Sequence, residues 1–168
     1  SSDPARVATG QAFLPITVQP SVARITLDAT AGGITEKLRT YKQDGTKWVL
    51  ENDLNEFHIT TAEAKNPGVK FNAASSKDGH GLDVKAYEWN FGDGTGVETT
   101  SSVTHKYKNE GKFPLRLEVT DNGNRKDRKL VNVVVGSVAA RMQVNKSIAE
   151  PDELIELDGS ISRSDRGP

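Results

Sequence analysis

Asp93 and the polar residues upstream of it are the side chains in this sequence whose types could do chemistry. Asp93 lies between Gly92 and Gly94, and Asp78 and Asn72 stand earlier, in what we expect to be a neighbouring loop. Oxygen atoms from adjacent loops are the ligands that Ca²⁺ prefers. The alternative is a structural role, in which the Asp93 carboxylate accepts hydrogen bonds from backbone N–H groups two residues on and holds a turn. The residues alone leave both hypotheses open.

The motifs of common catalytic sites are missing. The sequence has no cysteine, which excludes disulfides, thiolate zinc sites and cysteine nucleophiles. It contains no Gly-x-Ser-x-Gly, no His-Glu-x-x-His and no phosphate-binding glycine loop. The three histidines, His58, His80 and His105, do not have the spacing of metal ligands. The sequence therefore predicts a protein that is not an enzyme.

The charge balance excludes two classes of partner. The net charge is −1, from 22 basic and 23 acidic residues, which gives no overall attraction to nucleic acid or to an anionic membrane. The basic cluster at residues 125–129 is interrupted by Asp127 and is expected to be a solvated loop. No apolar run approaches the ~20 residues of a membrane span, so we expect no membrane insertion by this fragment.

An aromatic ladder precedes Asp93. Tyr87, Trp89 and Phe91 occupy alternate positions and so share one face of a strand. Such a row could form a flat platform for a sugar ring. We favour the other interpretation, in which Trp89 fills the gap between two sheets packed about 10 Å apart.

The elements that position these residues are strands. From Phe113 to Val119 apolar residues alternate with polar ones, the Asn-Gly pair at 122–123 predicts a tight turn, and Leu130 to Val135 predicts the return strand. Asp44-Gly45 predicts a second hairpin, and residues 57–60 predict a further strand. No stretch shows a helical stripe, so the fold class is all-β and the strand lengths favour a sandwich.

Three segments open alike. ARITLDAT, GVKFNAAS and ELIELDGS begin at residues 23, 68 and 153, and Leu27, Phe71 and Leu157 correspond. Phe71 and Leu157 are 86 residues apart, which suits one complete sandwich, whereas Leu27 and Phe71 are only 44 apart. The chain is therefore expected to contain one whole unit and the opening strands of another, after a shorter, diverged segment.

The middle of the chain resembles the polycystic kidney disease (PKD) domain family. Its hallmark Tyr-x-Trp-(Asp/Asn)-Phe-Gly-Asp-Gly corresponds to YEWNFGDG at residues 87–94, its His-x-Tyr to HKY at 105–107, and its strand pattern to GKFPLRLEVTD at 111–121. The resemblance implies an Ig-like antiparallel β-sandwich over residues 67–136. It implies partial or diverged β-sandwich segments on either side, at 1–66 and 137–168, the latter being the truncated start of a further repeat.

The same resemblance assigns structural roles to the motif residues. They are listed here in chain order: Tyr87, Trp89, Phe91, Gly92, Asp93, Gly94, His105, Tyr107 and Gly111. His105 is expected to form a hydrogen bond within the fold, and Tyr107 to clamp a corner as the tyrosine corner does in other sandwiches. Some members of the family bind calcium, which supports the Ca²⁺ candidates Asp93, Asp78 and Asn72.

The resemblance and the repeats together predict a non-enzymatic extracellular or cell-surface module. It would act as a spacer and protein–protein assembly unit of a large surface, adhesion or filament protein, with other chains or neighbouring repeats as partners. The alternative is an accessory domain of a secreted hydrolase that binds polysaccharide or protein substrate.

The last opening raises a separate expectation. Residues 142–158 offer strands whose apolar side chains, among them Ile148, Leu154, Ile155 and Leu157, lack a partner sheet within their own unit. The chain starts without a methionine, and we expect it to be cut from a longer protein. Edge strands of this kind pair readily with another chain, so an assembly with a neighbouring subunit is the second expectation.

Overall fold

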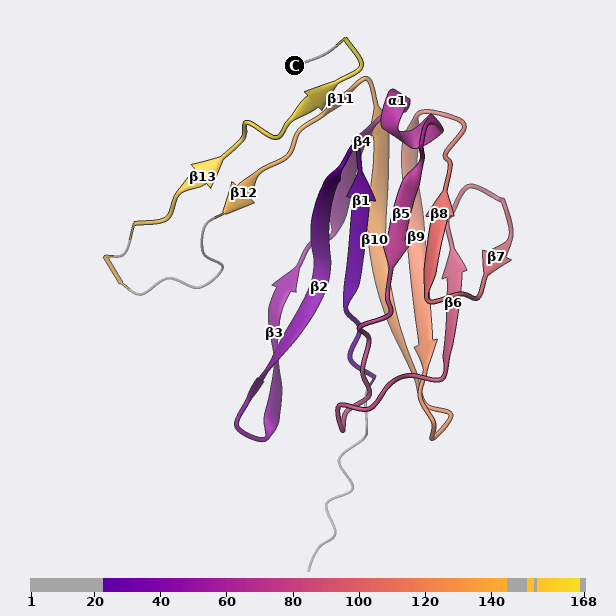
Figure 1. Ribbon diagram of the computed structural model, residues 1–168, viewed down its shortest axis with the longest axis vertical. Coiled ribbons are helices and arrows are strands. Elements are labelled where there is room, and N and C mark those ends of the chain that lie inside the picture. The colour runs from indigo at the N-terminus through magenta and orange to yellow at the C-terminus, as the bar shows by residue number, and fades with distance from the viewer. Residues whose placement is uncertain (1–22, 145–150, 153, 167–168) are drawn as a thin grey trace, which may run out of the picture.

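Two five-stranded sheets packed face to face form the main body, with one short helix at their upper end and an arm of short strands beside them (Figure 1). The computed structural model describes residues 23–144, 151–152 and 154–166. The all-β, Ig-like sandwich predicted from the sequence is confirmed.

The first sheet has the strand order β3-β2-β1-β5-β8. Its strands are β1 (Leu27–Ala31), β2 (Ile34–Asp44), β3 (Lys47–Asp53), β5 (Val69–Asn72) and β8 (Ser102–His105). All neighbouring pairs in this sheet are antiparallel. The Asp44-Gly45 turn joins β2 to β3, as predicted, with Gly45 at φ 58°.

The second sheet has the order β4-β10-β9-β6-β7. Its strands are β4 (Glu56–Thr60), β6 (Ala86–Asn90), β7 (Val97–Glu98), β9 (Gly111–Thr120) and β10 (Lys126–Gly136). β4 is parallel to β10, from Glu56↔Asn132 to Thr60↔Gly136, while the other pairs are antiparallel. The sheet therefore places β4, which precedes the predicted unit of residues 67–136, beside β10, the last strand of that unit.

The β9–β10 hairpin forms where the sequence predicted it, but its turn differs in detail. Asn124, not Gly123, has the positive φ of 62°. The Asp121 carboxylate accepts a hydrogen bond from the Arg125 backbone N–H at 2.9 Å and forms an ion pair with the Arg125 Nε at 2.7 Å. Asparagine tolerates the left-handed conformation through its short polar side chain, which explains why Asn124 can take the positive φ in place of Gly123.

The front segment joins the same two sheets. β1 pairs with β5 through Ala29↔Phe71, and β4 pairs with β10. The two sheets thus run across the boundary that the sequence analysis placed at residues 66/67. The first two related openings lie side by side in one sheet, at a spacing too short for two separate sandwiches. How the chain divides into independently folding units stays a prediction.

One helical turn, missed by the sequence analysis, follows β4. α1 (Thr61–Lys65) begins after Thr60, whose side chain accepts a hydrogen bond from the Glu63 backbone N–H at 3.2 Å. The Glu63 side chain in turn accepts from the Thr60 N–H at 2.9 Å. This reciprocal capping box stabilises a helix start, and it explains why so short a helix forms at the end of β4.

Aromatic side chains from both sheets fill the core. Phe71 of the first sheet lies 6.1 Å from Trp89 of the second and 5.7 Å from Phe91, which directly follows β6, measured between ring centroids. Trp89 is fully buried, as predicted, and its Nε1 donates to the Thr100 carbonyl oxygen at 2.7 Å. The aromatic ladder is core packing, which leaves Trp89 and Phe91 unable to serve as a sugar platform.

Four short strands form an arm beyond β10. They are β11 (Val138–Ala139), β12 (Gln143–Val144), β13 (Leu157–Asp158) and β14 (Arg163–Ser164). β11 pairs with β14 and β12 with β13, so these residues find backbone partners within the same chain. Leu154, Ile155 and Leu157 are exposed, and Ile148 lies outside the described residues. Pairing with another subunit stays a prediction.

Within the described ranges, no helix is long and apolar enough to cross a membrane.

Replacing Trp89 with alanine tests the central packing contact. We expect Trp89→Ala to lower the free energy of unfolding by about 3–5 kcal/mol, because burial is lost and a cavity remains. Urea unfolding followed by circular dichroism measures the loss. Leu130→Ala is the matched control, since Leu130 is 63% exposed and its truncation removes little buried surface. A Trp89→Ala chain as stable as the parent would contradict the core assignment.

Candidate functional site

The corner after β6 brings Asp93 against His105. Oδ1 of Asp93 accepts hydrogen bonds from the Thr95 backbone N–H at 3.2 Å and from Thr95 Oγ1 at 2.7 Å. Oδ2 of Asp93 lies 2.7 Å from Nε2 of His105, the last residue of β8. The two side chains are only 10% and 12% exposed. Asp93 therefore holds its own turn and also ties that turn to the opposite sheet.

The His105 ring lies in an aromatic stack. It is parallel to the Phe91 ring, with centroids 3.9 Å apart and 1° between the planes. Tyr107 meets the imidazole edge-on at 4.7 Å and 81°. The Phe91 ring is in turn parallel to that of Trp89, at 6.3 Å. The carboxylate and the rings form one continuous cluster, in which stacking orients the imidazole toward Asp93.

The carboxylate of this corner is held in its charged form. Burial alone would raise the pKa of Asp93, but the hydrogen bonds from Thr95 and His105 outweigh it and leave the pKa below its usual value. For Tyr107, burial and the nearby Asp93 charge raise the pKa of the phenol. The cluster thus contains one charged carboxylate and one neutral phenol.

The predicted corner clamp by Tyr107 is wrong. Its hydroxyl is buried and has no hydrogen-bond partner in the described part of the chain. The side chain instead packs by its ring, which stacks on Phe113 of β9 with centroids 4.8 Å apart. Tyr107 therefore contributes buried apolar area to the core, not a hydrogen bond to a strand corner.

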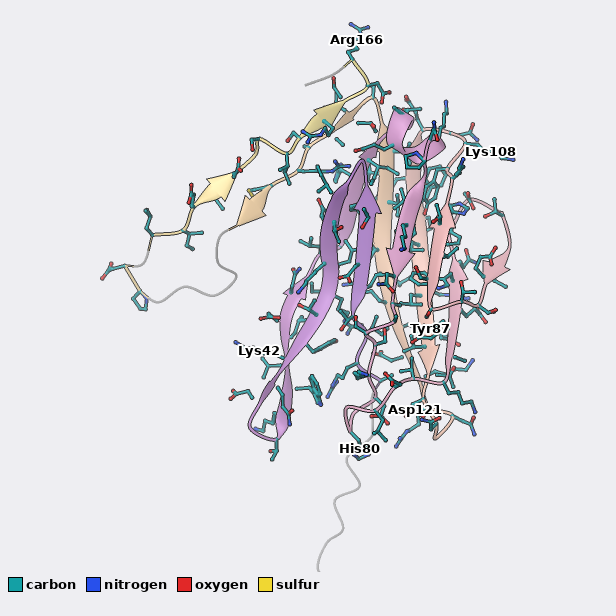
Figure 2. The ribbon with its side chains drawn as sticks, viewed as in Figure 1. Lys42, His80, Tyr87, Lys108, Asp121 and Arg166 are labelled. Carbon is teal, nitrogen blue, oxygen red and sulfur yellow. The ribbon has the colours of Figure 1, made fainter. Side chains whose placement is uncertain are left out.

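The structure does not bring the three calcium candidates into one site. Asn72 is the last residue of β5 and lies about 10 Å along this strand from Val69. Val69 pairs with His105, and it is His105 that contacts Asp93. Asp78 lies in the following loop, whose His80 is at the same end of the sandwich as Asp121 (Figure 2).

Each of the two upstream candidates already has backbone donors. Asn72 Oδ1 accepts from the Ala74 N–H at 3.0 Å. Asp78 Oδ1 accepts from the N–H groups of His80 and Leu82 at 2.8 and 2.9 Å. Among the described residues, no three His, Cys, Asp or Glu side chains gather in a way that could hold a metal ion. All three candidate oxygens instead stabilise turns.

The basic cluster at 125–129 is neutralised by neighbouring acids. Lys126 and Arg128 both bind Glu118, at 2.6 and 2.5 Å. Lys129, 4% exposed, forms an ion pair with Asp53 of β3. Residues 126–129 belong to strand β10, so the expectation of a solvated loop is wrong for them, and these basic residues serve the sandwich itself.

One buried pair escaped the sequence analysis. Glu63 of α1 and Arg141, beyond β11, form an ion pair at 2.8 Å. Thr60-x-x-Glu63 is a capping-box pattern and could have drawn attention to Glu63. Nothing local points to Arg141, since its partner lies 78 residues earlier in the chain.

The two sheets, the parallel β4–β10 pair and the aromatic corner together define a small Ig-like β-sandwich module. Residues 55–135 match the model of the PKD domain, which supports the resemblance of this segment to the PKD domain family. The match begins one residue before β4, so β1–β3 are strands added to the first sheet from outside it.

Two curated relatives are bacterial collagenases. The chain is 36% identical over 98 residues to collagenase ColA of Clostridium perfringens, which is 57% of this chain and 8% of that protein. It is 33% identical over 70 residues to collagenase ColA of Bacillus cereus, which is 42% of this chain and 7% of that protein. The chain thus spans less than a tenth of the length of either relative.

Gly92 and Gly94 both have a positive φ, but only Gly92 lies against another part of the chain. Substituting each of them therefore distinguishes the effect of steric overlap from that of backbone strain. Gly92 has φ 74°, and a Cβ there would lie 2.7 Å from both Cδ and the carbonyl oxygen of Pro114, whereas Gly94 has φ 83° and open space around it. We expect Gly92→Ala to lower the free energy of unfolding by about 2–4 kcal/mol, and Gly94→Ala by only about 1 kcal/mol. Urea titration of both variants checks this, and equal losses would contradict the role of Pro114.

The Asp93–His105 contact predicts a dependence of stability on pH. Because the pKa of Asp93 is lower in the folded chain, its contribution is complete above the unfolded pKa of about 4 and is lost as the pH falls through the folded pKa. We expect Asp93→Asn to cost about 1–2 kcal/mol at pH 7. The difference from the parent should shrink below pH ~4.

Urea unfolding between pH 2.5 and 7 measures this difference. Asp44→Asn, at the exposed end of β2, is the control and should follow the parent at every pH. A stability difference for Asp93→Asn that stays constant over this range would show that the carboxylate charge plays no part.

Proposed function

We propose that this chain is a non-catalytic spacer and assembly module of a large secreted protein. PKD domains are generally non-catalytic modules. The observation that carries the proposal is where the motif residues of this domain lie: Trp89 and Phe91 are in the core, and Asp93 and His105 bind each other. These residues are used to hold the two sheets together.

The burial of the aromatic residues favours a spacer role over a sugar-binding role. Every aromatic residue that the structure describes is buried or half-buried, including Tyr41, Trp48 and Tyr87. Stacking on sugars needs an exposed aromatic face, so polysaccharide is disfavoured as a partner. Protein partners and neighbouring units of the same chain fit better, because a strand edge such as that of β3 can pair with another backbone.

The comparisons favour a secreted hydrolase as the protein that contains this module. The two relatives described above are collagenases, and each shares only a small part of its length with this chain. We infer an accessory position beside a catalytic domain of that kind, outside the cell. A surface protein built from repeats is the second candidate, and the short strands β11–β14, which we interpret as the opening of a further sandwich, favour it.

The purified chain tests the proposal directly. Incubated with fibrillar collagen, gelatin and insoluble polysaccharide, it should release no soluble product and should remain in the supernatant after centrifugation. Hydrolysis of any of these polymers would overturn the non-catalytic assignment. Saturable sedimentation with collagen would overturn the spacer role in favour of substrate binding.

The two candidate hosts can be told apart from the gene. A catalytic domain encoded next to this segment supports the hydrolase, whereas an uninterrupted series of further PKD units supports the surface protein.

A further inference from the structure

A buried ion pair joins the sandwich to the strands that follow it. Arg141 lies between β11 and β12, and its side chain is 1% exposed. Its two terminal nitrogens donate to the two carboxylate oxygens of Glu63 at 3.1 and 2.8 Å, and its Nε donates to the His58 carbonyl oxygen at 3.1 Å. The guanidinium group is thus held in a fixed orientation by three hydrogen bonds to β4 and α1.

The Glu63 carboxylate is oriented by the sandwich itself. Its Oε2 also accepts from the N–H and the hydroxyl of Thr60, at 2.9 and 3.2 Å. Gly32, in the turn between β1 and β2, lies directly against Oε1, and any side chain at that position would overlap the carboxylate. The acceptor for Arg141 is therefore built from three separate elements: the β1–β2 turn, the end of β4 and α1.

A second contact ties the other side of the arm to the same surface. Asp165, after β14, accepts a hydrogen bond at its Oδ1 from the Ala62 N–H at 3.0 Å. Its own N–H donates to the Ser137 carbonyl oxygen at 2.9 Å. Ser162 Oγ bonds both the N–H and the carbonyl oxygen of Arg141, at 3.0 and 3.1 Å. Both chain segments of the arm are thereby connected to one end of the sandwich.

The connection between the two units is also short. β10 ends at Gly136 and β11 begins at Val138, so Ser137 alone separates them. Rotation of the arm would separate Arg141 from Glu63 and break the three hydrogen bonds that orient its guanidinium group. A linker that allows free movement is normally longer, polar and exposed.

We propose that the β1–β2 turn, the end of β4 and α1 form a docking surface for the next unit of the chain. Arg141 is the residue that fixes the angle between the two units, and the joint is rigid. The partner of this surface is the opening of a following sandwich, which presents an arginine just after its first strand. This inference concerns the joint and does not depend on which secreted protein contains the module.

Pairs of spin labels test the rigidity of the joint. The sequence has no cysteine, so Lys70→Cys on β5 and Leu157→Cys on β13 give two unique labelling positions, both exposed. Double electron–electron resonance on the whole chain should give a narrow distance distribution. Adding Arg141→Met should broaden the distribution at least twofold. A broad distribution in the unsubstituted background, or no broadening with Arg141→Met, would overturn the proposal.

Two further variants control for general destabilisation. Arg163→Met, on β14, removes an arginine whose guanidinium bonds the carbonyl oxygen of its neighbour Ser162, and should leave the distribution narrow. Arg141→Lys keeps the positive charge but loses the two-pronged contact, and should broaden the distribution even if Arg141→Met fails to fold. Equal broadening by Arg163→Met, or a narrow distribution for Arg141→Lys, would show that Arg141 does not set the angle.

Discussion

The packing of Phe71 against Trp89 and Phe91 is the contact on which the rest of the structure depends. It joins the two sheets, because Phe71 belongs to the first sheet, Trp89 belongs to the second, and Phe91 directly follows β6 of the second sheet. The His105 ring extends the cluster and places an imidazole against Asp93. The polar corner therefore forms only if the aromatic core is in place. In return, the turn held by Asp93 sets the direction in which the chain leaves β6.

Much of this arrangement follows from local sequence. The alternation of apolar residues is enough to predict β9, β10 and the buried face that includes Trp89. Each of these strand patterns is close in sequence to the turn residues that end or begin the strand. The arrangement of the front strands does not follow from local sequence. β1 pairs with β5 through residues about 40 positions apart, and strand patterns do not encode the choice of partner. α1 has a local signal in its capping box, but a single turn is too short to show a helical stripe.

The candidate site shows the same division between local and distant information. Turns held by Asn72, Asp78 and Asp93 use donors two to four residues away, and their side-chain types suggest them directly. Residue spacing alone could not predict the contact between Asp93 and His105, because it crosses from one sheet to the other. The Arg141–Glu63 pair could not be predicted from the sequence either, because only the folded chain brings these residues together.

The parallel pairing of β4 with β10 has a mechanical consequence. The matched segment enters the sandwich along β4 and leaves it along β10, and both strands run in the same direction side by side (Figure 1). Tension applied to the two ends of this segment acts along the strands and in opposite directions. The backbone hydrogen bonds between them are then loaded together, in shear, instead of being opened one after another. Such a unit resists extension until a whole ladder of hydrogen bonds breaks at once.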